Sequence, residues 1–331
     1  MTDLYRYVNQ RGKHRDLDVL AGWRQAYATA FGQALWPIPA KRLARCGQCL
    51  TIEHYQVPGA GTYQNIRNAD ACLQRFCPVC QRTSSLKAMF KLLSAIDMLD
   101  WERKGLTPLF LTLTIPAVPV EELKPAIDNL LKSWKRFRET KQVRKAYVAT
   151  FRALETNVNR ETRKANPHFH VLLFAHPDYF NAKAGLYLRQ RQLIGKWRQA
   201  TGIPNTKVVD IRRIRANPNH DDMSNPLLGA VLECAKYTVK ATSLIDDPYG
   251  PRPTVDPELL DHLHSALRGR RLHAYTGVLA KAAKAAKEAK EDEDRPSFLP
   301  EHASLQKTET WKWRPQLGKH VKTQTKLVDG K

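Results

Sequence analysis

The chain has 331 residues, with 54 lysine and arginine residues against 32 acidic ones, and its formal net charge is +22. This excess of positive charge indicates a polyanionic partner. Nucleic acid fits better than a membrane surface, because no basic amphipathic helix with aromatic anchors is evident. No apolar run reaches the roughly 18 residues of a transmembrane helix, and the first residues lack a secretion signal, so we expect a cytoplasmic protein without membrane contact.

Changes in composition along the chain predict four parts. They are an N-terminal helical segment (1–40), a cysteine-rich module (41–82), a larger mixed domain (83–275) and a weakly ordered tail with basic and acidic stretches (276–331). Within the tail, the alanine and lysine run of residues 280–290 is typical of a solvated helix or a tether.

Apolar periodicity predicts the secondary structure. Helices are expected over residues 17–35, 84–99, 120–138, 186–200 and from 226 to about 243, and strands over residues 50–52, 108–115, 147–156, 168–175 and 206–214. The polar residues 157–167 join two of these strands as a hairpin loop, so we expect that pair to be antiparallel.

Five of the six cysteines cluster within residues 46–80. A cytosolic chain rarely keeps disulfides, so clustered thiols indicate a structural zinc ion. Two Cys-x2-Cys pairs have zinc-ribbon spacing: Cys46 with Cys49, and Cys77 with Cys80. Cys72 and His54 remain alternative ligands, and reduced, buried thiols without metal are the simpler interpretation. Zinc here could position basic residues on DNA, namely Lys41, Arg42, Arg45, Arg75 and Arg82.

A second metal site is indicated by His168-Phe169-His170 at the start of a predicted strand. Residues two apart on a strand share a face, so the imidazoles project side by side. The predicted hairpin brings Glu155 of the preceding strand close to them. One carboxylate and two imidazoles with open positions suit Mg²⁺ or Mn²⁺ acting on phosphate, although zinc would also fit. The alternative is a pair of ordinary strand histidines.

A third set of residues lies on the predicted helix that begins near residue 226. At helical spacing, Glu233, Tyr237 and Lys240 share one face. A metal-polarised phosphate and a nearby cation would make attack by the Tyr237 phenol feasible, and Lys240 could supply that cation. Glu233 could accept a proton from the tyrosine or from water. Taken alone, such a stripe is more often a solvated helix face.

With these residues in view, the chain resembles the HUH endonucleases and, more closely, the rolling-circle replication initiator (Rep) proteins of small plasmids. The resemblance covers about residues 42–245. Three motifs carry it in a fixed order: the strand Phe110–Thr114, the stretch His168–Leu173, and the tyrosine motif Tyr237–Lys240 with Glu233 four residues before the tyrosine. The stretch Cys72–Arg82 also resembles the segment before the first motif in these initiators.

The resemblance implies an α+β fold, with a ferredoxin- or RRM-like palm after a small zinc-ribbon-like module. Its central antiparallel sheet would carry helices on one face and the metal on the other, within a nickase domain over residues 83–275. Tyr237 would attack a single-stranded or extruded site in the plasmid double-strand origin, leaving a 5′-phosphotyrosine and a free 3′-hydroxyl primer. Glu233 would activate water for the terminating cleavage. A host helicase and DNA polymerase would be partners.

Basic residues beside aromatic ones, or in a basic run, are candidate DNA contacts: Arg136, Arg138, Lys196, Arg198, Arg212 and Arg213. The neighbouring Trp134 and Trp197 could instead be core anchors of their helices. Two other functions remain open. One is a transposase or relaxase of the HUH superfamily, and the other is a non-catalytic zinc-ribbon DNA-binding protein.

Overall fold

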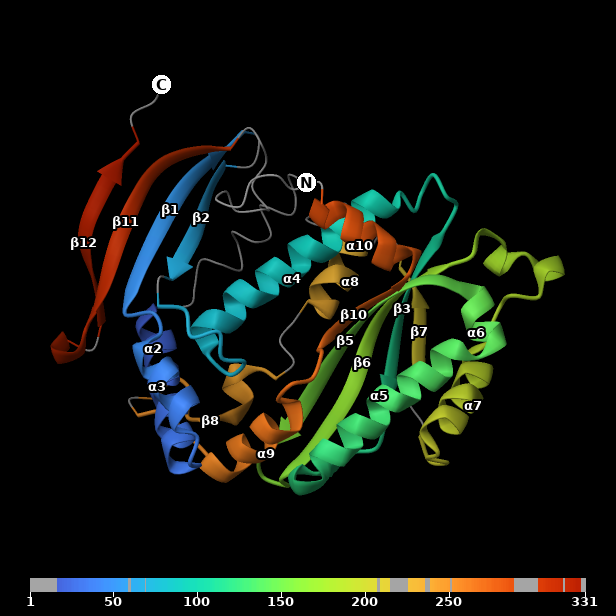
Figure 1. The fold of residues 1–331 in the computed structure, drawn as a ribbon, viewed down its shortest axis with the longest axis horizontal. Helices are drawn as coiled ribbons and strands as arrows, with labels where there is room; N and C mark the ends of the chain where they lie inside the picture. The colour runs from blue at the N-terminus through green and yellow to red at the C-terminus, as the bar shows by residue number, and fades with distance from the viewer. Residues whose placement is uncertain are drawn as a thin grey trace. The chain divides into compact units, whose positions relative to one another are not determined.

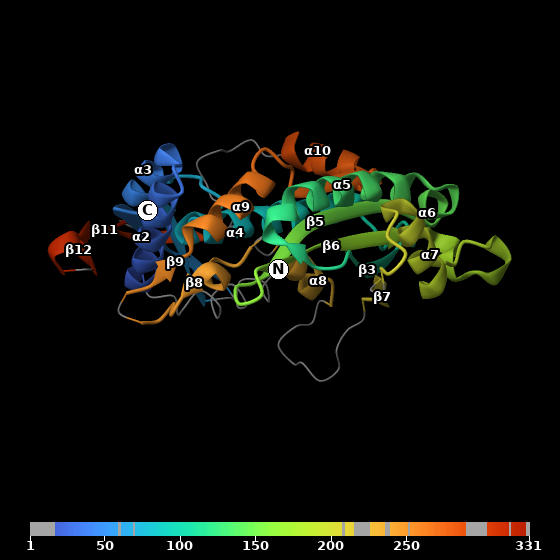
Figure 2. The same cartoon turned by 90° about the horizontal axis from the view of Figure 1, so that it is seen from below.

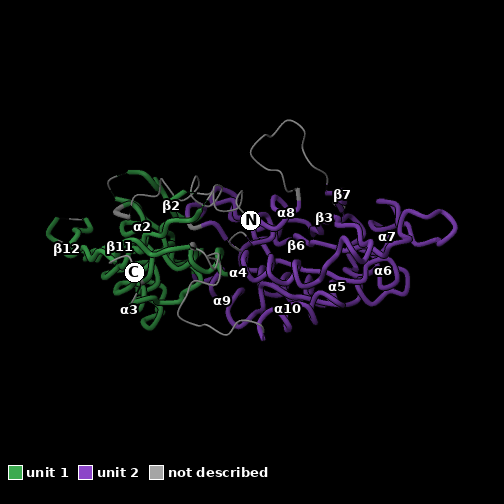
Figure 3. The backbone as a smooth tube through the Cα atoms, turned by 90° about the horizontal axis from the view of Figure 1, so that it is seen from above, with its two compact units in different colours: residues 1–87, 244–260, 292–331 green, residues 88–243, 261–291 purple. Residues whose placement is uncertain are grey.

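The computed structural model describes residues 17–58, 61–68, 70–206, 209–214, 226–235, 239–250, 252–288, 303–317 and 319–328. The chain divides into two compact units, shown in Figure 3. The first unit comprises residues 1–87, 244–260 and 292–331, and the second comprises residues 88–243 and 261–291. Both units are therefore assembled from segments that lie far apart in the sequence.

The second unit is built on a six-stranded antiparallel sheet with the strand order β10-β5-β6-β3-β7 and a short β4 beside β6. The strands are β3 (Thr107–Thr114), β4 (Val118–Pro119), β5 (Tyr147–Asn159), β6 (Lys164–Ala175), β7 (Val209–Arg213) and β10 (His273–Gly277). The predicted antiparallel hairpin is confirmed, but its strands are longer and its loop is shorter than expected.

One face of this sheet is covered by α5 (Leu123–Glu139), which follows a 3-10 turn at Val120–Glu122. Its apolar residues recur every three or four positions and are buried. Trp134 of α5 contacts Phe169 of β6 with ring centroids 6.1 Å apart. Figure 2 shows α5 and α10 (Val278–Glu288) on one side of the sheet.

The opposite face of the sheet carries α8 (Pro226–Cys234), as Figure 2 shows. Neighbouring residues of a strand alternate between faces, so Phe169 contacts α5 while His168 and His170 project toward α8. The expectation that the helices pack on one face is therefore wrong for α8. Its buried Leu227, Leu228 and Val231 give it an apolar side of its own to place against the sheet.

The helix predicted to run from residue 226 to about 243 ends at Cys234. Tyr237 lies outside the described residues. Lys240 is exposed and precedes a 3-10 turn at Ala241–Leu244, so it does not continue the face of α8 that carries Glu233. Beyond Cys234 the sequence includes the β-branched Thr238 and Val239, which have a lower helix propensity than alanine or leucine.

The remaining helices follow the predictions in part. They are α2 (Leu17–Gln33), α3 (Pro37–Arg45), α4 (Pro78–Leu99), α6 (Lys141–Ala146), α7 (Gln190–Thr201) and α9 (Pro257–Leu267), with short 3-10 turns at Pro177–Phe180, Ala182–Ala184 and Pro315–Leu317. Within the described part of the chain, no helix combines the length and the apolar composition needed to cross a membrane.

The first unit contains a four-stranded antiparallel sheet with the order β12-β11-β1-β2, visible in Figure 1. Its strands are β1 (Cys49–Val57), β2 (Gly61–Asn68), β11 (Ser304–Arg314) and β12 (Lys319–Leu327), and a small pair is formed by β8 (Ile245–Asp246) and β9 (Thr254–Val255). The inner strand β11 comes from the end of the chain and pairs with β1, for example Trp311 opposite Leu50.

The expectation of a weakly ordered tail after residue 276 is wrong for the described residues there, which form α10, β11 and β12. The charged composition hides a period-two pattern in which Glu309, Trp311 and Trp313 alternate with Thr310 and Lys312. This alternation is typical of a half-buried strand. The strand is completed only by pairing with a segment some 250 residues earlier, so local composition could not reveal it.

The Glu309 carboxylate is a charged centre of this sheet. It accepts hydrogen bonds from Lys307 at 3.0 Å and from the Trp311 indole at 3.3 Å, and it lies 3.3 Å from His54 Nε2. Burial acts to raise its pKa, but the hydrogen bonds from Lys307, His54 and Trp311 outweigh burial and hold the pKa at about 2. His54 is thus engaged with Glu309 and not with the cysteines.

We predict that Glu309→Gln lowers the free energy of unfolding at neutral pH by about 1–3 kcal/mol, because charge-assisted hydrogen bonds are lost. A depressed pKa contributes stability above the unfolded value, and this contribution fades as pH falls toward the folded value. The gap between wild type and variant should therefore shrink as pH drops from about 4.5 toward 2. Urea unfolding at several pH values measures this gap, and exposed Glu288→Gln on α10 is the control. A gap independent of pH would contradict the assignment.

Candidate functional site

Three metal-ligating side chains meet on the β5–β6 hairpin. Glu155 lies directly opposite His168 in the strand register, and His170 lies opposite Ala153. The Glu155 carboxylate is 3.2 Å from His170 Nε2 and 4.0 Å from His168 Nε2. One ligand atom from each residue lies within 4.8 Å of the other two. The predicted grouping of Glu155 with the two imidazoles therefore holds in the structure.

The other ring nitrogen of each histidine has a partner. His168 Nδ1 lies 3.0 Å from the carbonyl oxygen of Asn166, and His170 Nδ1 lies 3.4 Å from the Thr112 hydroxyl. Donation from Nδ1 of His168 to the carbonyl leaves the Nε2 lone pair directed at the Glu155 side. Such outer contacts orient metal ligands. The sequence reasoning missed Thr112, although the register of β3 against β6 places it opposite His170.

Burial keeps His168 suited to a cation. Burial lowers the pKa of His168, and the nearby His170 acts in the same direction, whereas the Asn166 contact and the carboxylates oppose them. The neutral imidazole is the form that ligates a metal. Two imidazoles beside a largely buried carboxylate form a donor set that fits a divalent cation.

A second carboxylate reaches this site from α8. Glu233 Oε1 lies 3.7 Å from His170 Nε2, and its side chain keeps 35% exposure. The buried side of α8 holds it in place against the sheet, with Cys234 fully buried at its end. Burial raises the pKa of Cys234, so this thiol acts as a core residue and not as a nucleophile. The structure thus brings Glu233 to the imidazoles.

An aromatic and a cationic side chain extend the site along the sheet. The Phe110 ring stacks on His170 at 5.4 Å, and the Arg212 guanidinium lies 6.0 Å from the Phe110 ring. Arg212 also pairs with Asp210 at 2.9 Å. Of the predicted DNA contacts, Arg212 is the one that the strand register places on the imidazole face. Phe110 belongs to the first sequence motif, and its alternation with Thr112 on β3 is the signal that could have identified it as a site residue.

The other predicted DNA contacts have local partners. Arg136 donates to the carbonyl of Ala200 at 2.7 Å, and Arg198 donates to the carbonyl of Thr206 at 3.0 Å. These bonds tie α5 and α7 to neighbouring backbone. The remaining three are Arg138, paired with Glu139 at 3.6 Å, Arg213, which lies 5.3 Å from the Phe180 ring, and the half-buried Lys196.

Both tryptophans beside these basic residues are core anchors. Trp197 is fully buried and donates its indole N–H to the carbonyl of Thr114 at 2.7 Å, and Trp134 is also buried. The core interpretation is the one that the structure supports. Neither ring is available for stacking on a base.

The first unit holds a cluster of four sulfurs from Cys46, Cys72, Cys77 and Cys80. The sulfur of Cys46 is 3.5 Å from those of Cys77 and Cys80, and Cys72 is 3.6 Å from Cys80. A tetrahedron with metal–sulfur bonds of about 2.3 Å has edges of about 3.8 Å, so this spacing suits a tetrahedral zinc ion. Hydrogen bonds from the neighbouring thiols lower the pKa of Cys46, while hydrogen bonds to Cys46 raise that of Cys77.

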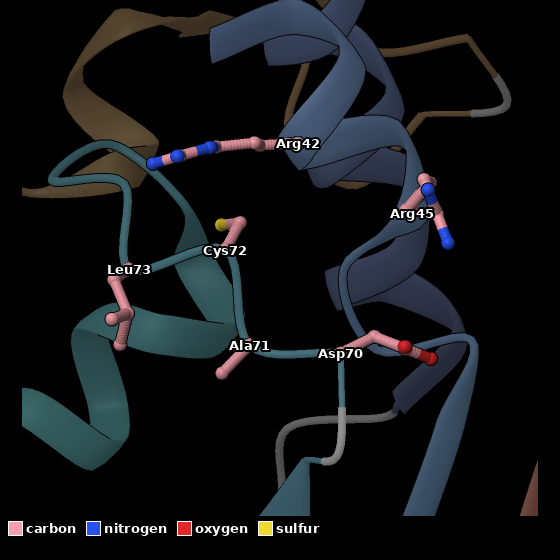
Figure 4. Close-up of a pocket in the computed structure, with 6 residues that line it drawn as sticks. All are labelled: Arg42, Arg45, Asp70, Ala71, Cys72 and Leu73. Atoms are coloured by element: carbon pink, nitrogen blue, oxygen red, sulfur yellow. The ribbon is translucent and has the colours of Figure 1, made fainter. Parts of the chain in front are cut away.

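The expectation that Cys49 belongs to this cluster is wrong, and Cys72 takes its place. Cys49 is the first residue of β1 and pairs with Lys312, so the strand directs it away from the other sulfurs. Cys72 lines a pocket of about 400 Å³ together with Arg42, Arg45, Asp70, Ala71 and Leu73, drawn in Figure 4. The sequence offered Cys72 only as an alternative because it lacks Cys-x2-Cys spacing.

Comparisons with known proteins agree with the motifs. The family described as "Replication protein" matches residues 63–321. A protein named "Protein rep" from Bacillus amyloliquefaciens is 31% identical over 278 residues, covering 81% of this chain and 79% of that protein. A "Protein rep" from a Bacillus species is 30% identical over 264 residues, covering 77% and 83%. One from Streptococcus pneumoniae serotype 2 is 27% identical over 238 residues, covering 72% and 69%. No solved structure matches the chain.

The family match covers residues 63–321, which include the imidazole motif and three of the four clustered cysteines, Cys72, Cys77 and Cys80. The alignment with the first relative covers 81% of this chain. The chain therefore belongs to the family of Rep replication proteins, the plasmid rolling-circle initiators that its motifs resemble.

Proposed function

We propose that this Rep protein nicks one strand of a plasmid origin by transesterification, and that the nicked end primes rolling-circle replication. The observation that carries the proposal is the meeting of Glu155, His168 and His170 on one hairpin, with Glu233 of α8 only 3.7 Å from His170. A non-catalytic DNA-binding protein has no need for such a buried donor set, so the site favours catalysis over the binding-only alternative.

In this proposal Glu155, His168 and His170 hold a divalent cation, Mg²⁺ or Mn²⁺. A cation at such a site supplies Lewis-acid stabilisation of charge on a phosphate and helps to orient it. The residues of the chain fix its place: Asn166 and Thr112 orient the two imidazoles, and the strand register fixes the carboxylate.

Tyr237 is the proposed nucleophile, on the strength of the family motif. The phenol gives up its proton as its oxygen bonds to the phosphorus of the scissile phosphodiester. The bond from phosphorus to the 3′ oxygen breaks, and that oxygen takes up a proton. The products are a 5′-phosphotyrosine and a free 3′-hydroxyl. Lys240 is an exposed cation three residues after Tyr237 in the sequence and is proposed to offset charge on the phosphate. Because Tyr237 must reach the phosphate in line, the substrate at the nick is single-stranded or extruded.

Glu233 is proposed as the base of the terminating step. There a water molecule gives a proton to the carboxylate and its oxygen bonds to the phosphorus of the scissile phosphodiester. The bond from phosphorus to the 3′ oxygen breaks and that oxygen takes up a proton, which leaves a 5′-phosphate and a free 3′-hydroxyl, so the terminating cleavage needs no second tyrosine. The partly exposed position of Glu233 beside His170 supports access to water. A free 3′-hydroxyl has to be extended and the duplex unwound, so a host DNA polymerase and a host helicase are the expected partners.

We also propose that Cys46, Cys72, Cys77 and Cys80 hold a structural zinc ion. Four sulfur ligands form a closed site without an open position for substrate. Arg24 supports this interpretation, because its guanidinium donates to the carbonyl of Cys46 and is itself buried, which places a positive charge beside the thiolates.

We predict that Tyr237→Phe abolishes the covalent adduct with DNA. Wild-type protein incubated with Mn²⁺ and a labelled single-stranded origin oligonucleotide should give a shifted band on a denaturing gel. The variant should give none, because only the phenolic oxygen can form the phosphotyrosine bond. The exposed Tyr249→Phe is the matched control and should behave as wild type. An adduct of undiminished yield with Tyr237→Phe would contradict the assignment.

We predict that Glu233→Ala still forms the adduct but is slow in the terminating cleavage. Loss of a positioned base costs about 10²–10⁴-fold in rate. Cleavage of a second labelled origin oligonucleotide by the purified adduct, followed on the same gels, separates this step from the first cleavage. If the variant adduct hydrolyses the second oligonucleotide at the wild-type rate, Glu233 does not activate water.

We predict that Cys72→Ser lowers bound zinc well below the one equivalent expected for wild type, whereas Cys49→Ser leaves it unchanged. The reason is that Cys72 lies among the clustered sulfurs and Cys49 does not. Elemental analysis of the dialysed proteins measures the content. Zinc loss with Cys49→Ser and retention with Cys72→Ser would reverse the ligand assignment.

A further inference from the structure

The sheet of the first unit has two faces of different character. One face carries the buried Leu50, Ile52 and His320 and packs near α2, whose Arg24 lies 5.7 Å from the Trp313 ring. Because neighbouring residues alternate, the next residues along β11 belong to the other face. That second face has no role in the proposed nicking chemistry.

The second face carries a set of exposed basic side chains. Lys312 and Arg314 alternate with the tryptophans of β11 and are exposed. Arg314 lies opposite Lys319 of β12. Lys326 of β12 lies opposite Thr308, which is on the same face of β11 as Lys312 and Arg314. We call this set, Lys312, Arg314, Lys319 and Lys326, the basic face.

Little negative charge offsets the basic face. Glu53 lies on the same side of the sheet, but it is buried and already bound to Arg67 at 2.6 Å. In the described part of the chain, no carboxylate forms an ion pair with any member of the basic face. Toward the opposite end of β1, Tyr55 and Tyr63 are buried with Leu305. The part of this side that stays exposed to solvent is therefore the part that carries the basic residues.

We propose that the basic face binds duplex DNA through its phosphates, an inference that rests on the proposed action of this protein at a DNA origin. The stretch of β11 from Thr308 to Arg314 spans six residue steps, which is about 20 Å of strand. A duplex of that length carries about 12 phosphate charges. Single-stranded DNA is usually held by exposed aromatic rings, and the tryptophans of β11 belong to the other side of the sheet.

Protection of a sheet edge would explain some of these residues but not all. Lysines on an edge strand hinder unwanted strand pairing, and β12 is the edge strand of this sheet. Lys312 and Arg314, however, lie on β11, which is flanked by β1 and β12. An inner strand needs no such protection, so phosphate binding accounts for the whole set.

The test compares two variants of the full chain that each lose three charges. The first is Lys312→Gln with Arg314→Gln and Lys319→Gln. The matched control is Lys281→Gln with Lys284→Gln and Lys287→Gln on α10, which are also exposed. Affinity for a duplex without an origin is measured at several salt concentrations. Adduct formation with the single-stranded oligonucleotide is measured in parallel.

We expect the first variant to lower the slope of log affinity against log salt by about two to three, since each lost phosphate contact removes about 0.9. Its duplex affinity at low salt should fall at least about tenfold, and nicking of the single strand should match wild type. An unchanged slope, an equal loss in the α10 control, or an equal loss for single-stranded DNA would overturn the proposal. Normal duplex binding by a wild type that forms no adduct would instead refute the proposed nicking.

Discussion

The functional site depends on the register of one antiparallel hairpin. Glu155 faces His168 across the β5–β6 ladder, and a shift of one residue would turn every side chain to the other face of the sheet. The register is fixed from the other side, where Phe169 packs against Trp134 and the Arg152 guanidinium lies 4.5 Å from the Phe169 ring. Core packing on one face thus determines the geometry of the ligands on the other.

The first unit is stabilised in a different way. Its sheet joins strands from opposite ends of the chain, and its core includes the stacked Tyr27 and Phe76 rings beside the cysteine cluster. Zinc bound by four thiolates would add a cross-link among α3, the segment before α4 and α4 itself. The basic face then lies on a sheet whose edges and core are fixed by long-range contacts.

Much of the candidate site could be predicted from the sequence because its signals are local. A His-x-His on an apolar strand, an acidic residue on the strand before it and a polar loop between them define the hairpin without any distant contact. The helix signal at Pro226 predicted that Glu233 lies on a helix, whereas its approach to His170 is seen only in the structure. The β3 residues Phe110 and Thr112 were missed as site residues because their role depends on strand pairing across the sheet.

Other features could not be predicted, since they depend on tertiary structure. The helix signal in the sequence continues past Cys234, where α8 ends in the structure. The choice of Cys72 over Cys49 depends on β1 pairing with β11, which begins some 250 residues later. The strands of the tail are concealed by lysine-rich composition, and they form only because β1 offers a partner.

The measurement that tests the central claim most directly is calorimetric titration of Mn²⁺ into zinc-loaded protein. The account predicts one Mn²⁺ bound per chain by wild type and by His176→Gln, in which the altered histidine lies outside the cluster. It predicts that binding is lost in the His168→Gln, His170→Gln double variant. Unchanged stoichiometry and affinity in the double variant would contradict the claim that these imidazoles hold the cation.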